Sequence, residues 1–323
     1  MDKKEGEKIE ISVIVPVYRS NEHLISLYAQ LVESLEKLKK PFEMIFVEDC
    51  GGDKSWDALQ KIASQDNRVV SIKLSKNFGQ HAATICGIAH GKGNWIVTID
   101  DDLEQDPNEI VALYNEAIKG YDLVYGVFDD RSHSLWRNFT SVSARKLFTI
   151  AIPSLNYEYT SFRIIKSHIA KRLDQFDSPY PFIDGYLSWL TNNYSTVKVS
   201  HSERGSGTSN YTFTKLMRHT INIFVSFSEL PLKFSSWIGL FTSGLGLLWL
   251  LFILVGKLLG AVTLSGYPSI MAAILFFGGI QLIVLGVIGE YISRINFKTS
   301  KQPLYIVGQI KEYEGIIESS SAK

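Results

Sequence analysis

The chain has 323 residues, of which 46% are hydrophobic and 20% charged, and its 33 basic and 33 acidic side chains cancel. That length suits one large domain with an appendage, and a net charge of zero leaves no overall positive field, so a nucleic-acid partner is not expected. Two cysteines, Cys50 and Cys86, are too few for a disulfide framework or a cysteine-rich zinc site.

Strand and helix patterns alternate from the N-terminus to about residue 130. Compact runs of β-branched and other apolar residues predict five strands, at 11–18, 42–49, 69–75, 94–102 and 121–128. Between them lie helical patterns, such as the leucines spaced from Leu24 to Leu38 and the stretch 79–90. Strands separated by helices predict an α/β domain with a mostly parallel sheet.

Polar residues follow three of these predicted strands. The strand ends read Pro16–Tyr18, Glu48–Asp49 and Asp100–Asp102. Ligands of such sheets bind beyond the carboxyl ends of the strands, so these residues are the first candidates for a site.

The acidic run from Asp100 to Glu104 is the most informative of these ends. Hard oxygen ligands at alternate positions suit Mg²⁺ or Mn²⁺, which usually bridge substrate phosphates. A solvated acidic turn that caps the next helix through Asp106 is an equally good explanation of the run alone. The apolar strand Trp95–Ile99 directly before it favours the metal, because it brings the acids to the edge of the sheet.

Basic partners for a phosphorylated substrate occur only as single residues, because the chain lacks a P-loop and a GxGxxG fingerprint. The candidates are Arg131, Arg137, Arg163, Arg204 and Lys215. Each by itself is more typical of a surface charge. Arg204 differs in lying within a Gly/Ser-rich stretch, residues 201–211, where a loop could hold phosphate groups.

Two long apolar stretches, 234–256 and 258–289, are separated by Lys257, the only charged residue between Phe234 and Gly289. About 20 apolar residues span a bilayer, so both stretches predict membrane helices rather than a buried hairpin of a soluble protein. Basic residues flank the pair on its outer sides, which predicts that both termini are cytoplasmic. These residues are Lys215, Arg218 and Lys233 before the pair, and Arg294, Lys298 and Lys301 after it.

The patterns together predict four regions along the chain. These are a cytosolic domain over 1–210, an amphipathic membrane-interface segment over 211–233, two transmembrane helices over 234–293 and a cytosolic tail over 294–323. Small residues in the spans (Gly239, Gly244, Gly246, Gly278 and Gly279) favour helix packing and a homo-oligomer. A strand predicted at 303–307 could pair with the sheet of another subunit.

Several motifs in serial order resemble those of one family. They include ISVIVPVYRSNE (11–22), VEDCGGDKS (47–55), TIDDDLEQDP (98–107) and HSERGSGTSNYTFTKLMR (201–218). With the two spans, they resemble the polyisoprenyl-phosphate glycosyltransferases of glycosyltransferase family 2, the bacterial relatives of dolichol-phosphate mannose synthase. The resemblance implies a GT-A fold and a metal-dependent enzyme in the bacterial inner membrane. It would transfer a sugar, with inversion, from a nucleotide sugar, often UDP-linked, to a polyprenyl phosphate such as undecaprenyl phosphate, for cell-envelope glycan modification.

The resemblance also implies residue roles. Beside the nucleotide lie Pro16, Tyr18 and Glu22, with Asp49 recognising the base and Asp101 contacting the substrate. The Mg²⁺ or Mn²⁺ ligands are Asp100, Asp102 and Glu104, with Asp102 the principal one. The diphosphate or acceptor phosphate is contacted by Arg131 and Arg204, with Ser209 and Lys215 nearby.

Three positions depart from the family pattern. Ser161 stands where relatives commonly have an acid before a Phe-Arg pair, so a general-base role of that acid does not transfer. Phe128 replaces a common arginine, and Cys50 replaces a usual glycine. Two other functions remain open at this point: transfer to a different glycolipid or saccharide acceptor, and a non-catalytic two-span scaffold.

Overall fold

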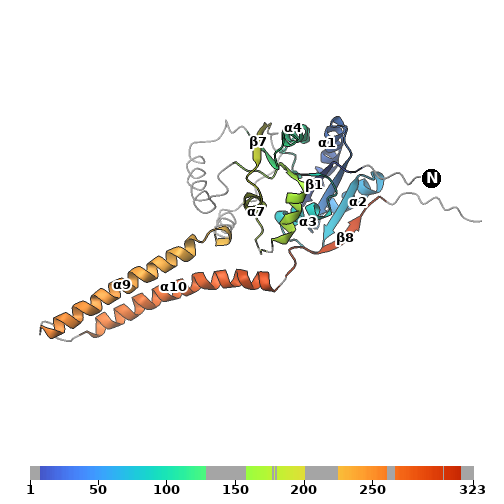
Figure 1. Ribbon diagram of the computed structural model, residues 1–323. Helices are drawn as coiled ribbons and strands as arrows, with labels where there is room; N and C mark the ends of the chain where they lie inside the picture. The colour runs from blue at the N-terminus through green and yellow to red at the C-terminus, as the bar shows by residue number, and fades with distance from the viewer. Residues whose placement is uncertain are drawn as a thin grey trace, which may run out of the picture. The chain divides into compact units, whose positions relative to one another are not determined.

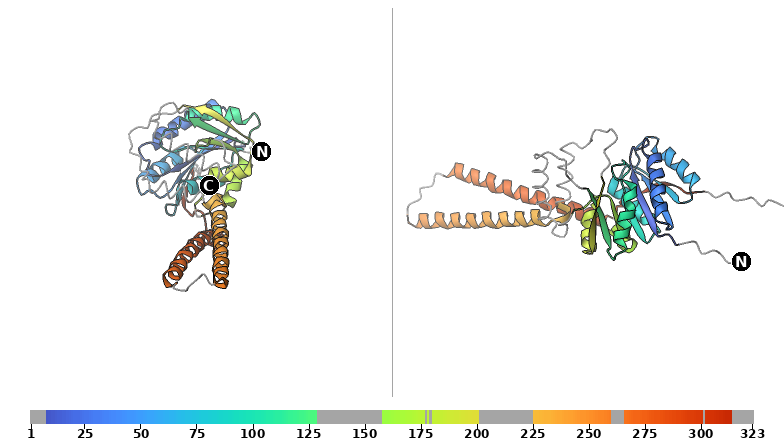
Figure 2. Two further views of the ribbon diagram at one scale, coloured as in Figure 1. Left: turned by 90° about the vertical axis from the view of Figure 1, so that its left-hand side faces the viewer. Right: turned by 90° about the horizontal axis from the view of Figure 1, so that it is seen from above.

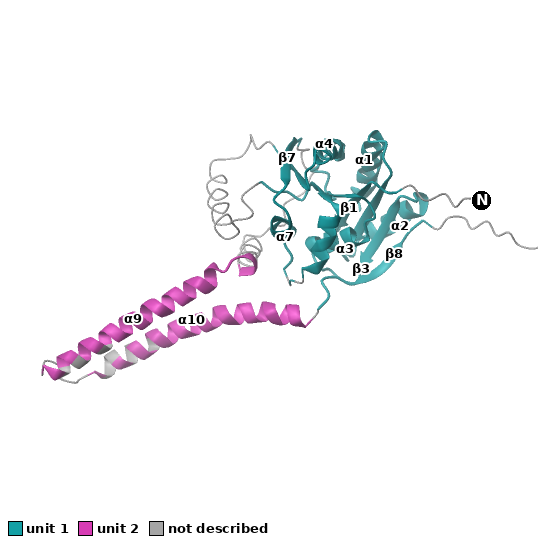
Figure 3. Cartoon of the chain, viewed as in Figure 1, with its two compact units in different colours: residues 1–149, 153–211, 302–323 teal, residues 150–152, 212–301 magenta. Residues whose placement is uncertain are grey.

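The computed structural model describes residues 8–128, 158–176, 178, 180–200, 225–259, 266–300 and 302–313. The chain forms two compact units (Figure 3). The sheet unit comprises residues 1–149, 153–211 and 302–323, and the hairpin unit comprises 150–152 and 212–301.

The sheet unit is built on an eight-stranded sheet (Figure 1). Its strands are β1 (Ile11–Val17), β2 (Phe42–Glu48), β3 (Val69–Leu74), β4 (Trp95–Thr98), β5 (Leu123–Phe128), β6 (Arg163–Lys166), β7 (Tyr194–Val199) and β8 (Val307–Lys311). They lie in the order β7-β5-β6-β4-β1-β2-β3-β8, and all but β6 and β8 run in one direction. The α/β class and the mostly parallel sheet predicted from the sequence are therefore confirmed.

Helices cover both faces of this sheet. On one face lie α1 (Leu24–Lys37), α2 (Ser55–Gln65) and, after a 3₁₀ turn at Pro107–Glu109, α4 (Ile110–Ala117); on the other lie α3 (Gln80–His90), α6 (Ser167–Ala170), the 3₁₀ helix η2 (Lys171–Gln175) and α7 (Ile183–Leu190). Side chains of a strand alternate between faces, and β1 follows this rule. Val13 and Val15 join the cluster of the α1 leucines, whereas Ile14 faces Gly87 of α3. A β-carbon at Gly87 would lie 2.3 Å from Ile14 Cγ2, so α3 packs with its backbone close to the sheet.

The predicted strand at 94–102 is shorter in the structure. Strand β4 ends at Thr98, which pairs with Ile14 of β1, and the Ile99 amide makes one more bond to the Ile14 carbonyl, of 3.1 Å. Beyond this point the chain turns, with Leu103 in the left-handed region at φ 62°. The three aspartates therefore lie in a loop at the strand end and not within the sheet.

The C-terminal strand corrects a prediction. It spans Val307–Lys311 rather than 303–307, and it pairs antiparallel with β3 of the same chain. The Ser75 amide extends this pairing to the Ile306 carbonyl at 2.9 Å. Without β8, the outer side of β3 would expose unpaired backbone groups, and the chain's own tail satisfies them. The strand therefore begins four residues later than predicted and pairs within its own chain, and the pairing with another subunit's sheet stays a prediction.

The hairpin unit consists of α9 (Leu230–Leu258) and α10 (Tyr267–Thr299), which run side by side (Figures 1 and 2). Both helices are long and apolar enough to cross a membrane, over Leu230–Ile253 and Phe276–Thr299. Most of their large apolar side chains are exposed, which indicates association with a membrane. Of the predicted interface segment 211–233, residues 211–224 lie outside the described residues and Leu230–Lys233 begin α9.

Hydrogen bonds tie the end of α10 to the segment before α9. The Tyr291 hydroxyl donates to the Ser228 carbonyl at 2.7 Å. The Arg294 guanidinium donates to Ser226 Oγ at 2.5 Å and to Glu290 at 2.8 Å. The contacts to Ser226 and Ser228 attach this end of α10 to the segment before α9, whereas the contact to Glu290 lies within α10.

Candidate active site

The strand order reverses at β1, with β2 on one side and β4 on the other. Such a switch point opens a crevice between the carboxyl ends of the two central strands. Here Asp101, after β4, accepts hydrogen bonds from the Tyr18 amide at 2.9 Å and from the Ser20 hydroxyl. Its carboxylate therefore joins the loop after β1 to the loop after β4.

A hollow of about 270 Å³ lies at this edge, and we call it the carboxylate hollow. Its lining includes Pro16, Tyr18, Asp49 and the aspartates 100–102. Tyr18 is 46% exposed, so its ring offers an accessible aromatic surface there. The Arg19 guanidinium lies 5.2 Å from the centroid of that ring and also donates to the Gly51 carbonyl at 2.9 Å.

Asp49 forms one side of the carboxylate hollow and holds the turn that leads into α3. Its two carboxylate oxygens accept the Phe78 amide at 2.7 Å and the Gly79 amide at 2.8 Å. Burial raises the pKa of Asp49, and the two amide hydrogen bonds oppose that rise. A carboxylate has about four lone-pair sites, so two bonds leave it able to accept further donors.

Asp100 receives three side-chain hydrogen bonds. Its Oδ1 accepts from Gln80 Nε2 at 2.7 Å, and its Oδ2 accepts from Gln105 Nε2 at 3.0 Å and from Ser161 Oγ at 2.5 Å. Burial raises the pKa of Asp100 to about 6, and Asp102 and Asp101 add to the rise while Ser161 opposes it. The donors therefore stabilise a carboxylate whose ionised form is otherwise disfavoured.

The acidic run fits a divalent cation that also binds a substrate. Asp100 and Asp102 both line the hollow, and Asp102 Oδ1 accepts the Glu104 amide at 3.1 Å. Within the described ranges, no three His, Cys, Asp or Glu side chains come together as a closed metal cage. Mg²⁺ commonly uses only one or two carboxylates together with substrate phosphates, and oxygen ligands of this kind are what the hollow offers.

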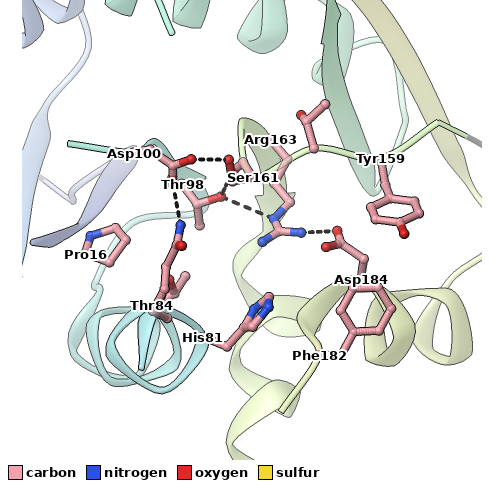
Figure 4. Close-up of a pocket in the computed structure, with 12 residues that line it drawn as sticks. Pro16, His81, Thr84, Thr98, Asp100, Tyr159, Ser161, Arg163, Phe182 and Asp184 are labelled. Atoms are coloured by element: carbon pink, nitrogen blue, oxygen red, sulfur yellow. Dashed lines mark hydrogen bonds and ion pairs between the residues drawn. The ribbon is translucent and has the colours of Figure 1, made fainter. Parts of the chain in front are cut away.

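A second cavity, of about 260 Å³, adjoins the first and shares Pro16, Gln80 and Asp100 with it (Figure 4). We call it the inner cavity. A buried ion pair between Arg163 of β6 and Asp184 of α7 lies at its base. Arg163 Nε also donates to Thr98 Oγ1 at 3.2 Å, and the Tyr125 hydroxyl donates to Asp184 at 3.0 Å. Arg163 is 2% exposed, so its interpretation as a surface charge was wrong.

Aromatic rings form another wall of the inner cavity. Phe182 meets the His81 and Tyr159 rings edge to face, with centroids 6.0 Å and 5.7 Å away (Figure 4). A cavity with apolar rings on one side and fixed polar groups on the other suits a small, hydroxyl-rich group.

The structure brings together six of the residues selected from the sequence. Around the carboxylate hollow lie Pro16, Tyr18, Asp49, Asp100, Asp101 and Asp102. Glu22 lies in the exposed turn before α1, and neither Glu22 nor Glu104 lines the two cavities. Arg131, Arg204, Ser209 and Lys215 lie outside the described residues.

Sequence reasoning did not select Gln80, Gln105 or Asp184 as site residues, and it considered Arg163 only as one of five single basic residues, each more typical of a surface charge. For the last two a signal existed: Arg163 stands between Phe162 and Ile164, and Asp184 lies within the apolar run 181–187. A charge inside a run that predicts burial is rarely left unpaired, which points to a buried partner.

Two protein families and several individual proteins are similar in sequence to most of the chain. The family described as "Glycosyl transferase family 2" matches residues 12–174, and "GtrB C-terminal hairpin" matches residues 230–295. The uncharacterized glycosyltransferase YkcC of Bacillus subtilis is 32% identical over 304 residues, which cover 93% of each chain. The bactoprenol glucosyl transferase of Shigella phage SfV is 30% identical over 307 residues, 94% of this chain and all of that one.

Among solved structures, glucosyl-3-phosphoglycerate synthase from Mycobacterium tuberculosis, in complex with Mn²⁺, uridine diphosphate and phosphoglyceric acid, is 18% identical. The match has a TM-score of 0.49 and covers 69% of this chain and 78% of that one.

Proposed function

The chain belongs to glycosyltransferase family 2, and from that premise we propose that it transfers a hexosyl group from a nucleotide sugar to a polyprenyl phosphate. The observation that carries the proposal is that Asp100 lines both the carboxylate hollow and the inner cavity. The carboxylate hollow is lined by carboxylates and the Tyr18 ring, and the inner cavity is lined by the ion pair of Arg163 and Asp184. Relatives named bactoprenol glucosyl transferases match nearly the whole chain, including the membrane hairpin, which supports a lipid acceptor.

The nucleotide occupies the carboxylate hollow in this proposal. The exposed Tyr18 ring would pack against the base. Asp49, a group that only accepts hydrogen bonds when ionised, suits a base with an N–H donor such as the N3–H of uracil. Other bases also carry N–H donors, and we take the donor to be a UDP-sugar because transferases of the family that the chain resembles often use UDP-sugars.

Asp100 and Asp102 would hold a Mg²⁺ or Mn²⁺ ion, with Glu104 approaching it. When bound, such an ion neutralises the charge that develops on the departing diphosphate. Asp101 contributes by holding the loops after β1 and β4 at a fixed separation. Gln80 donates to Asp100 at 2.7 Å from the first turn of α3, at the boundary between the two cavities.

The hexosyl group occupies the inner cavity. Thr98, Arg163 and Asp184 supply fixed hydrogen-bonding groups for its hydroxyls, and the Phe182 side packs against its apolar face.

The acceptor phosphate then attacks the anomeric carbon from the face opposite the leaving diphosphate, which gives inversion. A phosphate with a second pKa of about 6 is already ionised at neutral pH, so a strong general base is not needed. Ser161 is consistent with this, because its hydroxyl donates to Asp100 instead of accepting a proton. From the family resemblance we assign the phosphate contacts to Arg131 and Arg204, and supporting roles in substrate binding to Ser209 and Lys215.

The hairpin of α9 and α10 would keep the enzyme at its lipid substrate, in the inner membrane of a bacterium with both termini cytoplasmic. The product, a lipid-linked sugar on the cytoplasmic face, would serve modification of cell-envelope glycans. Assembly into a homo-oligomer stays a prediction, and native mass spectrometry of the detergent-solubilised chain would test it.

A transfer assay tests this function directly. Membranes containing the chain would receive undecaprenyl phosphate and a panel of labelled nucleotide sugars, with and without EDTA. We expect label in the organic phase from a UDP-hexose only when metal is present. Metal-dependent nucleotide binding without transfer would point to a different acceptor, and absence of both would favour a non-catalytic scaffold.

A further inference from the structure

Gln105 makes three contacts around Asp100, although it lines neither cavity. Its side-chain oxygen accepts the Asp100 backbone amide at 3.0 Å. Its side-chain nitrogen donates to Asp100 Oδ2 at 3.0 Å and to Ser161 Oγ at 2.7 Å. Gln105 is buried, so this one amide group fixes both the backbone and the carboxylate of Asp100.

Ser161 completes a closed arrangement with these two residues. Its hydroxyl accepts from Gln105 and donates to Asp100 Oδ2 at 2.5 Å. Its own carbonyl accepts from Thr98 Oγ1 at 2.5 Å, which attaches the segment before β6 to the end of β4. Each of these side-chain polar atoms has a hydrogen-bond partner within the arrangement, so the network determines the orientations of the hydroxyl and the amide.

Gln105 and Ser161 both donate to Oδ2 of Asp100. The other carboxylate oxygen, Oδ1, accepts a hydrogen bond from Gln80 of α3. Three neutral donors, from Gln80, Gln105 and Ser161, therefore converge on a single carboxylate beside Asp101 and Asp102. A merely structural polar cluster would not need to concentrate its donors on the residue that faces both cavities.

We propose that Gln105 and Ser161 are positioning residues that hold the Asp100 carboxylate in the orientation that a divalent cation requires. The inference rests on the proposed function, because it presupposes a metal-assisted transfer. It also gives position 161 a role in this chain: the serine replaces a possible base with a hydrogen-bond donor to the metal-binding carboxylate.

Two substitutions separate positioning from packing. Ser161→Ala removes one donor to Asp100 with little change in volume. Gln105→Glu keeps the shape and the acceptor for the Asp100 amide, but turns the donor that faces Asp100 Oδ2 into a second carboxylate oxygen. Ser161→Thr retains the hydroxyl and serves as the conservative variant.

Ser188→Ala is the matched control. Ser188 is a buried serine of the sheet unit, and its hydroxyl donates to the Gly185 carbonyl at 2.7 Å rather than to the carboxylate of Asp100. It measures what the loss of one buried hydroxyl hydrogen bond does to the fold alone.

The measurements use the full-length chain in detergent or nanodiscs. Mn²⁺ affinity would be measured by electron paramagnetic resonance in the presence of UDP, UDP affinity by calorimetry without metal, and stability by thermal unfolding. Substitution of a group that orients a metal ligand typically lowers metal affinity by about 10- to 100-fold. We expect losses of that size for Ser161→Ala and Gln105→Glu, recovery in Ser161→Thr, and no loss in Ser188→Ala.

Unchanged Mn²⁺ affinity in both variants, with a loss of stability like that of Ser188→Ala, would overturn the inference and leave the proposed function intact. A wild-type chain that binds UDP but no Mn²⁺ would overturn the metal assignment and this inference with it. A wild-type chain that binds neither would instead refute the proposed function.

Discussion

The sheet unit and the hairpin unit differ in how their apolar side chains are covered. In the sheet unit, the apolar residues of β1 and the leucines of α1 are fully buried against one another. In the hairpin unit, Phe241, Trp249 and Ile283 are each about two-thirds exposed. The sheet unit makes its own core, whereas the hairpin needs lipid to cover it.

Polar groups differ between the two units as well. The carboxylates that line the hollow of the sheet unit follow β2 and β4, and each of Asp49, Asp100 and Asp101 accepts at least two hydrogen bonds. In the described part of the hairpin unit, ion pairs lie near the helix ends, at Lys233 and Arg294. The polar side chains suited to binding a substrate therefore lie where the strands end and the backbone turns. The hairpin offers an apolar surface for association with a membrane.

The strongest way to break this comparison is to remove the principal metal ligand from the strand ends. We expect Asp102→Asn to reduce transfer at least about a thousandfold, because a metal's stabilisation of developing charge is worth several kcal/mol. The labelled-lipid assay measures it, with thermal unfolding as a check on folding. Asp106→Asn is the matched control, since Asp106 caps the next turn by accepting the Asn108 amide and asparagine caps equally well. Retained transfer in Asp102→Asn would sink the metal assignment.

Breaking the buried ion pair of the sheet unit should have the next largest effect. Asp184→Ala leaves Arg163 charged and buried without its carboxylate, which typically costs about 3–5 kcal/mol of folding free energy. Glu33→Ala, which breaks the exposed pair with Lys37, should cost less than about 1 kcal/mol. Thermal unfolding of both variants compares them, and equal shifts would contradict the buried role of the pair.

A third substitution compares the surroundings of the two units directly. Ile25 on α1 is 67% exposed and Ile283 on α10 is 66% exposed, so protein atoms cover them almost equally. Arginine in place of Ile283 should disfavour membrane insertion by about 2.5–3.5 kcal/mol, whereas Ile25→Arg, facing water, should change stability by no more than about 0.5 kcal/mol. Membrane fractionation of the two variants gives the answer. If Ile283→Arg inserts as well as Ile25→Arg, α10 does not face lipid at that position.

The smallest expected effect is a difference in alkylation between the two cysteines, which tests whether a nucleotide binds beside Asp49. Burial raises the pKa of the Cys86 thiol to about 12, so at pH 8 it stays protonated and should resist alkylation until the chain unfolds. Cys50 is partly exposed and follows Asp49, so it should react in the native chain and be protected by UDP. Mass spectrometry after iodoacetamide treatment distinguishes the two thiols. Native labelling of Cys86 would contradict its burial, and UDP-independent labelling of Cys50 would argue against a nucleotide beside Asp49.

Local patterns predicted β1 to β5 and part of the site, but β6 and β7 were not predicted. The apolar runs of β1, β2 and β3 lie within one residue of their predicted ends, because buried parallel strands require continuous apolar sequence. The acids after β4 were recognisable because three adjacent carboxylates are costly without a partner. Strand β8 was misplaced because a single short strand carries no information about which edge it joins.

By itself, the sequence determined the α/β class, the two apolar helices and the carboxylates at the strand ends, since each depends on the order of residues within one segment. Only the tertiary structure decided that Arg163 meets Asp184, that Gln105 and Ser161 converge on Asp100, and that the tail completes the chain's own sheet. These contacts join residues far apart in the chain. Their formation depends on strand order and register, which packing of the whole sheet sets.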